Sequence, residues 1–253
     1  MATMYGNEFG NILRGSREGD FLYGRNGNDT LYGYDGDDFL AGGAGNDTLY
    51  GGAGNDTYVV DSQYDQVIEL AGEGIDTVVT GTHHWLAANV ENLRTARPLD
   101  TVPVDLGGNE LDNVITGSDG ANSISGGGGA DRLFGAAGAD TLIGGNGNDR
   151  LTGGAGADTF VFTDTDHSVD TITDFQHGID NVDLGWWVTE MGGASFHFIG
   201  SAAFGHHAGE GRYANGVFQL DANGDGSADL TINSIYAIGA GDFTFGAAGY
   251  WDY

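Results

Sequence analysis

The stretch GGAGNDTLYGGAGNDTYVV, residues 42–60, contains one nine-residue unit written twice. Numbered from its first glycine, the unit reads Gly-Gly-x-Gly-x-Asp-x-apolar-x, and the first glycine recurs every nine residues back to Gly6. A period of nine fits no helix, in which each glycine would cost about 1 kcal/mol. It fits a turn of about six residues followed by a strand of about three, so that two units form one coil of a parallel β-solenoid.

The nonapeptide register covers two arrays of six units each, residues 6–59 and 108–161. The eighth slot of every unit is apolar, and we expect it to point into the core because neighbours on a strand face opposite sides. The glycines are expected to supply turn conformations with positive φ. Asp37 holds the fifth slot, where other units carry Asn or Ala, so its side chain is expected to be dispensable. The sixth slots hold Asn11, Asp20, Asp29, Asp38, Asp47, Asp56, Asn113, Asn122, Asp131, Asp140, Asp149 and Asp158.

The composition of the 253 residues narrows the function classes. A net charge of -29 excludes nucleic acid and an anionic membrane as partners, because neither has positive charge to offer. The absence of cysteine excludes disulfides and thiolate metal sites. The N-terminal MATMYGNEFG lacks the basic region and apolar stretch of a cleavable signal, and no apolar run is long enough for membrane insertion.

The sixth-slot carboxylates point to calcium. Units on one side of a coil are 18 residues apart and stack at about 4.8 Å, which would make a repulsive column of carboxylates. Calcium takes six to eight oxygen ligands and relieves that repulsion. The alternative is a metal-free Asx turn, which accepts Asn as well as Asp; nine of the twelve slots are Asp, which favours calcium.

We expect about five primary calcium sites and up to eight in the two arrays. The five primary pairs are Asp20/Asp38, Asp29/Asp47, Asp38/Asp56, Asp131/Asp149 and Asp140/Asp158. Three weaker pairs contain an amide: Asn11/Asp29, Asn113/Asp131 and Asn122/Asp140. The turn glycines leave backbone carbonyls facing the next coil, which adds Gly33, Gly42, Gly51, Gly135, Gly144 and Gly153 to the predicted metal-site residues.

The nonapeptides resemble the repeats of the RTX (repeats-in-toxin) family. This resemblance implies a parallel β-roll, calcium bound between turns, and a secreted, extracellular protein exported by the type I secretion apparatus. In that family the export address lies near the C-terminus, which would account for the missing N-terminal signal.

Residues 62–107 depart from the template. Gly6 and Gly108 are separated by eleven nines plus three residues, so this segment is expected to form irregular coils that join the arrays. His83 and His84 precede Trp85 here, but neighbouring strand residues face opposite sides, so a two-histidine metal site is not expected. We therefore divide the all-β chain into a first array (1–61), a connector (62–107), a second array (108–162) and a C-terminal β-rich cap region (163–253).

The cap region contains DTITDFQHGIDNVDL (170–184) and is similar to the C-terminal region of serralysin-type metallopeptidases. Its terminal GDFTFGAAGYWDY places an acid before aromatic residues at Asp242, Phe243 and Phe245, like the export signal of that family, with Gly246–Tyr253 as extra residues. Trp186 and Trp187 could line a sugar-binding face, but one of two adjacent strand residues should be core.

The segment DANGDGSAD places four oxygen-bearing side chains in one loop. It can be an acidic hairpin turn, which we favour, or a calcium loop. The four residues are Asp221, Asn223, Asp225 and Asp229.

No catalytic motif is readable. His-Glu-x-x-His is absent, as is Gly-x-Ser-x-Gly, so neither a zinc peptidase nor a lipase-type nucleophile is expected. We predict a non-catalytic, secreted protein that folds on binding extracellular calcium, its extracellular ligand being unknown. The alternative is the C-terminal module of a secreted enzyme, such as a serralysin-type peptidase or a polysaccharide-modifying enzyme. An adhesive or surface-layer role also remains open.

Overall fold

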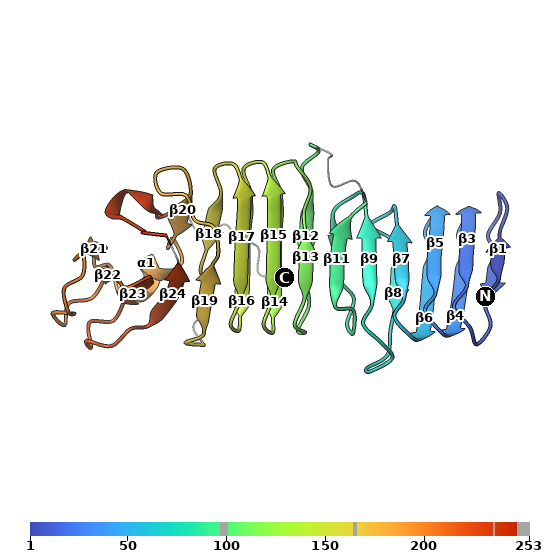
Figure 1. Cartoon of the computed structure of the whole chain (residues 1–253), viewed down its shortest axis with the longest axis horizontal. Helices are drawn as coiled ribbons and strands as arrows, with labels where there is room; N and C mark the ends of the chain where they lie inside the picture. The colour runs from blue at the N-terminus through green and yellow to red at the C-terminus, as the bar shows by residue number, and fades with distance from the viewer. Residues whose placement is uncertain (97–100, 164–165, 235, 247–253) are drawn as a thin grey trace.

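The computed structural model describes residues 1–96, 101–163, 166–234 and 236–246. It is an elongated β-solenoid with the N-terminal coil at one end and the cap region at the other (Figure 1). Apart from strands, the described residues contain a four-residue helix α1 (Trp187–Glu190) and a 3-10 turn (Ala240–Asp242). The expected all-β parallel solenoid is confirmed. Among the described residues no helix has the length and apolar character needed to cross a membrane.

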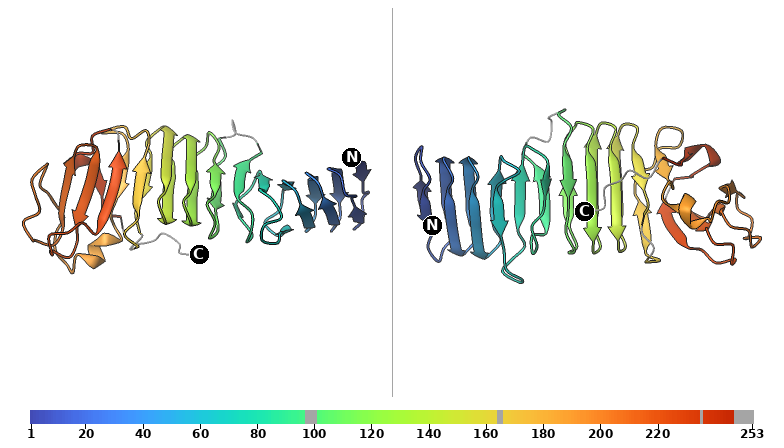
Figure 2. Two further views of the ribbon diagram at one scale, coloured as in Figure 1. Left: turned by 60° about the horizontal axis from the view of Figure 1, so that its bottom comes forward. Right: turned by 180° about the vertical axis from the view of Figure 1, so that it is seen from behind.

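One long sheet runs the length of the molecule; it contains every second strand up to β19 and then four strands of the cap region (Figures 1 and 2). Its strands, in spatial order, are β1 (Thr3–Tyr5), β3 (Phe21–Asn26), β5 (Phe39–Ala44), β7 (Thr57–Val60), β9 (Thr77–Thr80), β11 (Asn92–Thr95), β13 (Val114–Thr116), β15 (Arg132–Ala137), β17 (Arg150–Ala155), β19 (Val169–Ile172), β24 (Leu230–Ser234), β23 (Val217–Asp221), β22 (Glu210–Ala214) and β21 (His197–Phe198).

The alternate strands form two shorter sheets on the opposite side of the coil. The first contains β2 (Ile12–Arg14), β4 (Thr30–Asp35), β6 (Thr48–Ala53) and β8 (Gln66–Ile68). The second contains β10 (His84–Trp85), β12 (Asp105–Gly107), β14 (Ser123–Gly128), β16 (Thr141–Asn146), β18 (Thr159–Val161), β20 (Asn181–Asp183) and β25 (Phe243–Thr244).

The register confirms that two nonapeptides make one coil. Leu22 pairs with Leu40 and Leu133 with Leu151, each 18 residues apart in parallel strands. The strands are longer than the expected three residues, because the parallel ladder continues past the first glycine into the turn. In β3 and β5, for example, Arg25 still pairs with Gly43.

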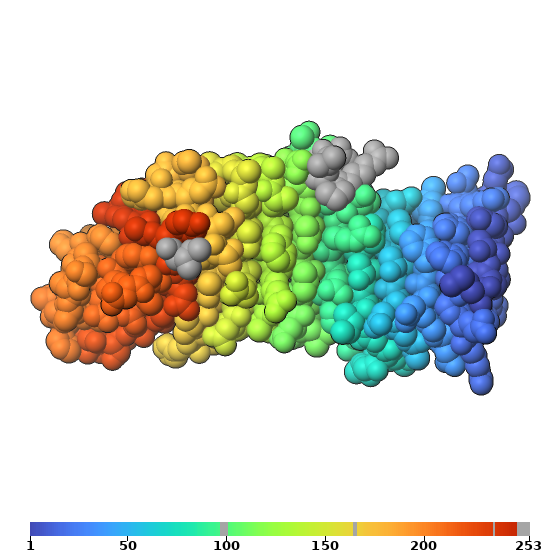
Figure 3. All heavy atoms as spheres, viewed as in Figure 1, coloured from blue at the N-terminus to red at the C-terminus, as the bar shows by residue number. Residues whose placement is uncertain are grey.

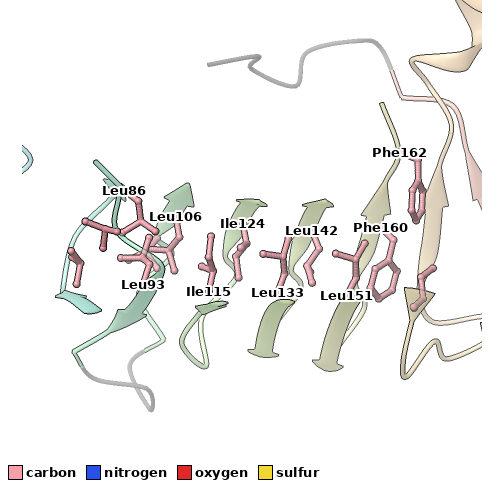
Figure 4. Close-up of a cluster of buried hydrophobic side chains, with 14 of the residues drawn as sticks. Leu86, Leu93, Leu106, Ile115, Ile124, Leu133, Leu142, Leu151, Phe160 and Phe162 are labelled. Atoms are coloured by element: carbon pink, nitrogen blue, oxygen red, sulfur yellow. The ribbon is translucent and has the colours of Figure 1, made fainter. Parts of the chain in front are cut away.

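The core is a row of eighth-slot side chains between the two layers. Figure 4 shows Ile115, Leu133 and Leu151 from the long sheet interleaved with Ile124 and Leu142 from the opposite one. All five are fully buried, and burying such a side chain contributes about 1.5–3 kcal/mol. The first glycine of each unit also faces inward, which explains why a side chain is excluded there.

The connector continues the solenoid with coils of unequal length. Thr57 pairs with Thr77, Thr77 with Asn92, and Asn92 with Val114, so the three coils contain 20, 15 and 22 residues. They exceed three regular coils by three residues, the excess predicted from the spacing of the two arrays. The opposite layer is interrupted between β8 and β10.

The cap region covers the far end of the core (Figure 3). Strand β24 extends the long sheet in parallel from β19, and β23 then reverses direction. Phe218, Leu220 and Ile232 are fully buried and belong to the same continuous core as the leucines of the arrays. Because the last coil is covered in this way, its apolar end is not exposed to water.

Candidate calcium sites

The sixth-slot side chains stack into four columns, two in each array. The backbone N–H of Asp20 donates to Asp38 Oδ1 at 2.6 Å, and that of Asp38 donates to Asp56 Oδ1 at 2.7 Å. The same bond recurs in the other columns. One carboxylate oxygen is therefore tied to the backbone, and Oδ2 remains for another partner. In chain order the columns are Asn11–Asp29–Asp47, Asp20–Asp38–Asp56, Asn113–Asp131–Asp149 and Asn122–Asp140–Asp158.

Eight of the twelve turns, here called open turns, have a second residue with positive φ, between 81° and 101°. Their sixth residues are Asp29, Asp38, Asp47, Asp56, Asp131, Asp140, Asp149 and Asp158. Within the described part of the chain, buried Oδ2 atoms that accept no hydrogen bond occur at Asp29, Asp38, Asp47, Asp56, Asp131, Asp140 and Asp158. A buried carboxylate oxygen without a donor is costly.

The other four turns, here called capped turns, end at Asn11, Asp20, Asn113 and Asn122. In each, the second residue's N–H donates to the sixth residue's side chain; Ser16 N–H reaches Asp20 Oδ2 at 2.7 Å, and Asn7 N–H reaches Asn11 Oδ1 at 2.7 Å. None of these second residues has positive φ. Capped turns have the form of the metal-free Asx turn, which was the alternative to calcium binding. The first turn of every column is a capped turn.

A glycine carbonyl oxygen also lies beside the sixth-slot oxygen, in the capped turn that begins at Gly15 as well as in open turns. A Cβ built on Gly33 would overlap Asp38 Oδ2 and lie 2.6 Å from the carbonyl oxygen of Gly51 in the next coil. The same convergence of a carboxylate and a glycine carbonyl occurs at Gly24, Gly126 and Gly135. Carboxylate and carbonyl oxygens without competing N–H donors are the ligands that calcium prefers, so the residues present fit this ion.

The predicted site residues divide between the two kinds of turn. Four of the five primary pairs join two open turns: Asp29/Asp47, Asp38/Asp56, Asp131/Asp149 and Asp140/Asp158. In the fifth pair, Asp20 lies in a capped turn, and its Oδ1 accepts the Ala2 N–H. Each amide pair also joins a capped turn to an open one. The six predicted glycines all begin open turns, and each would place a Cβ on its own turn's aspartate.

Burial raises the pKa of the open-turn carboxyls. The pKa of Asp38 and that of Asp47 rise to about 6, chiefly through desolvation and further through neighbouring carboxylates. The pKa of Asp56 rises to about 7 for the same reasons. In capped Asp20, burial also raises the pKa, but hydrogen bonds from Ala2 and Ser16 outweigh it and leave the pKa lowered. Open turns therefore resist ionisation unless a cation is bound.

The columns continue beyond the nonapeptide arrays, which the sequence analysis missed. Asp47 N–H donates to Asp65 Oδ1 and Asp56 N–H to Asp76 Oδ1 after the first array, and Asp170 and Asp180 continue the second in the same way. The signal was present, because Asp65, Asp76 and Asp180 each directly precede a short strand and Asp170 lies at the start of one.

Fifth-slot side chains form a further ladder at the surface. Asp37 Oδ1 accepts the N–H of Asn55 at 2.8 Å, and Asn28 Oδ1 accepts that of Asn46 at 3.0 Å. These bonds lie at the surface and link successive coils.

In each of the histidine and tryptophan pairs, one side chain is buried and the other is at least partly exposed. His83 is exposed and contacts Asp105, whereas His84 is buried, so the two face opposite ways as expected. Trp187 is buried and Trp186 is half-buried, with the two rings meeting edge-on. They lie at the start of α1, not on a strand as expected.

The 221–229 segment is the favoured hairpin: β23 and β24 pair in antiparallel fashion. Asp221 accepts N–H bonds from Gly224 and Gly226, and Asp229 accepts bonds from Ala222 and Asn223. These carboxylates bond to their own loop.

The aromatic residues of the terminal motif lie in the cap region. Phe243 packs its ring against Phe196 and Phe218, and Asp242 is buried against His177. Of the extra C-terminal residues, 247–253 lie outside the described residues.

Comparison with known proteins agrees with the geometry. A family model of the RTX calcium-binding nonapeptide repeat matches four times, at residues 5–40, 32–67, 107–142 and 134–162. No curated protein matches the chain. The matched segments contain every open turn, and the coils they build form a parallel β-solenoid. The chain is therefore a calcium-binding protein of the RTX type and belongs to the RTX β-roll family.

Proposed function

We propose that calcium binds in the four gaps between successive open turns, and that the gaps next to capped turns bind it weakly or not at all. The observation that carries this proposal is the set of buried Oδ2 atoms without hydrogen-bond donors at the open turns. In a capped turn the same oxygen already accepts an N–H bond, so ion binding there would have to break it. Isothermal calorimetry of the whole chain tests the number of sites; fewer than four per chain would contradict the proposal.

We further propose that calcium drives folding. The net charge of -29 opposes a compact calcium-free chain, and the open turns bury carboxylates in columns. Extracellular calcium modules bind at about 10⁻⁴–10⁻³ M, so the chain would fold outside the cell and stay unfolded inside it. Far-ultraviolet circular dichroism in chelator and then in millimolar calcium tests this. A β spectrum that does not change with calcium would contradict it.

We propose that the four segments of the chain have different roles. Segments 1–61 and 108–162 hold calcium, 62–107 joins them within one solenoid, and 163–253 covers the last coil and carries a type I export signal. The RTX repeats support an extracellular location, since such proteins are typically extracellular. Co-expression with a type I secretion apparatus should bring the chain into the medium, and deletion of 163–253 should retain it. Export of the deleted chain would place the signal elsewhere.

We propose that the chain itself is not catalytic, because its paired carboxylates serve as ion ligands and turn acceptors. The alternative, a module that serves an attached enzyme, predicts the same behaviour for this segment. The purified chain should not hydrolyse casein, esters or alginate. Turnover that follows the protein through repurification would overturn the proposal.

A further inference from the structure

The last open turn of the first array, 51–56, meets a coil that is no longer a nonapeptide. Strand β8 pairs with β6 up to Tyr50↔Ile68, so the next residue, Glu69, takes the place that a first glycine holds in the regular coils. That place faces inward. A Cβ built on Gly51 would lie 2.6 Å from Glu69 Oε1, where regular open turns have a glycine carbonyl oxygen.

Three carboxylates from three turns converge at this junction. Asp56, Glu69 and Asp76 each place one oxygen within 4.8 Å of the others. Their side chains are buried, with exposures of 1%, 6% and 1%. Asp76 lies beyond the matched repeats, and so does Glu69.

Two carboxylate oxygens of this cluster lack hydrogen-bond donors. Within the described residues, Asp56 Oδ2 and Glu69 Oε2 are buried and accept no hydrogen bond. Glu69 Oε1 accepts a hydrogen bond from the hydroxyl of Tyr58, which replaces the usual leucine in the eighth slot. This contact holds the Glu69 side chain over the turn, while Asp76 Oδ1 accepts the Asp56 N–H at 2.8 Å.

Among the described residues, no positively charged side chain pairs with this cluster. In the described ranges, no arginine or histidine forms an ion pair with any of the three carboxylates, and the chain has no lysine. Two oxygens on opposite sides of one calcium ion, each at 2.3–2.6 Å, are about 5 Å apart. The spacing of the cluster therefore suits one calcium ion, whereas magnesium would need a tighter octahedron at about 2.0–2.1 Å.

We propose that Asp56, Glu69 and Asp76 bind a calcium ion at the junction between the first array and the connector. In this site a glutamate carboxylate takes the part of the glycine carbonyl, and the Tyr58 hydroxyl orients it. The choice of calcium as the ion rests on the proposed function of the repeat turns; the site itself rests on the three carboxylates. The site lies at the end of the first array, and two of its three ligands come from residues outside the nonapeptide repeats.

The test compares calcium stoichiometry in the full-length wild type and the Glu69→Gln variant by equilibrium dialysis. Glutamine keeps the size and can still accept the Tyr58 bond, but it removes the charge. We expect one calcium fewer per chain, with the β spectrum retained at saturating calcium. Glu8→Gln, at an exposed glutamate, is the matched control and should bind the wild-type number. If Glu69→Gln binds the wild-type number with an unchanged midpoint, Glu69 is not a ligand and the proposal is overturned.

Two further measurements cover a variant that fails to fold. Asp76→Asn keeps the acceptor for the Asp56 N–H and should also lose one calcium. A crystal structure of the wild-type chain grown with calcium should show an anomalous peak within about 2.3–2.6 Å of a Glu69 oxygen. If peaks occupy the gaps between open turns but none lies at Glu69, this inference fails while the proposed function stands. If the wild type binds no calcium at all, both fail.

Discussion

The turns of the first coil in each array differ from the turns that follow them, although both are built from the same nonapeptide. The difference is in what the sixth-slot side chain contacts. In the first coil, the turn's own backbone N–H occupies the sixth-slot oxygen, as at Ser16 and Asp20. In the next two turns of the column, at Asp38 and Asp56, the same oxygen is buried without a donor. The difference lies in the second residue of the turn, whose φ is positive only in the open turns.

This comparison shows that the aspartate alone does not make a calcium site. Asp20 and Asp38 are both buried sixth-slot aspartates in the same column, and both are bonded to the neighbouring coil. A positive φ at the second residue turns its N–H away from the carboxylate and leaves that oxygen for an ion. The backbone of the turn therefore decides whether the acid stabilises the turn or binds calcium.

The largest expected effect concerns the stability of the calcium-free chain, which should fall as the pH rises. In the folded state the carboxyl pKa of Asp38 is about 6 and that of Asp56 about 7, above the unfolded value of 3.8. A raised folded pKa stabilises the fold fully below the unfolded value, and that stability is lost as pH rises through about 6 to 7. In chelator, circular dichroism should show more β structure at pH 5 than at pH 8.

With calcium present, the stability of the fold should instead increase as the pH rises, because protons compete with the ion for the same oxygens. The calcium midpoint for folding should fall as pH rises from 5 to 8. A calcium-free chain that gains β structure between pH 5 and pH 8 would show that the open-turn carboxyls are not buried as described.

The next effect separates the two kinds of turn directly. Asp38→Ala should lower calcium stoichiometry and raise the calcium midpoint several-fold, because it removes a carboxylate from an open turn. Asp20→Ala removes a turn cap, which costs about 1 kcal/mol, but should leave stoichiometry unchanged. Calorimetric titration of both variants gives the comparison. Equal loss of calcium in the two would mean that capped turns also bind the ion.

Most of the fold could be predicted from the sequence, because the period of nine fixes coil length, the inward slot and the column of acids together. Residues such as Leu40 and Asp38 lie where that register placed them. The division into open and capped turns could not be predicted, because Arg25, Tyr34 and Ala136 adopt positive φ although they are not glycines. Each of the three pairs with a glycine of the next coil: Gly43, Gly52 and Gly154. Glu69 escaped prediction because it belongs to no repeat.

A smaller effect tests that backbone requirement. Ala136 is the second residue of an open turn, with φ of 87°, a conformation that strains an alanine by about 1–2 kcal/mol. Ala136→Gly removes this strain but makes the unfolded chain more flexible, so we expect a net gain of about 0.5–1 kcal/mol. Ala137→Gly, one residue on and without positive φ, should destabilise by about 0.5–1 kcal/mol. Urea unfolding at saturating calcium measures both, and the same sign for the two variants would contradict the assigned turn geometry.

The smallest effect concerns Asp37, which stands next to Asp38 but in the fifth slot. Its Oδ1 accepts one exposed bond from Asn55 N–H, so Asp37→Ala should cost no more than about 0.5–1 kcal/mol. Asp37→Asn should change stability by less than about 0.5 kcal/mol, because Asn28 makes the equivalent bond one turn earlier. Neither variant should change calcium stoichiometry, since the fifth-slot oxygen faces solvent and the sixth-slot oxygen faces the gap between coils. If Asp37→Ala loses as much calcium as Asp38→Ala, the ion lies on the outer ladder and not in the buried columns.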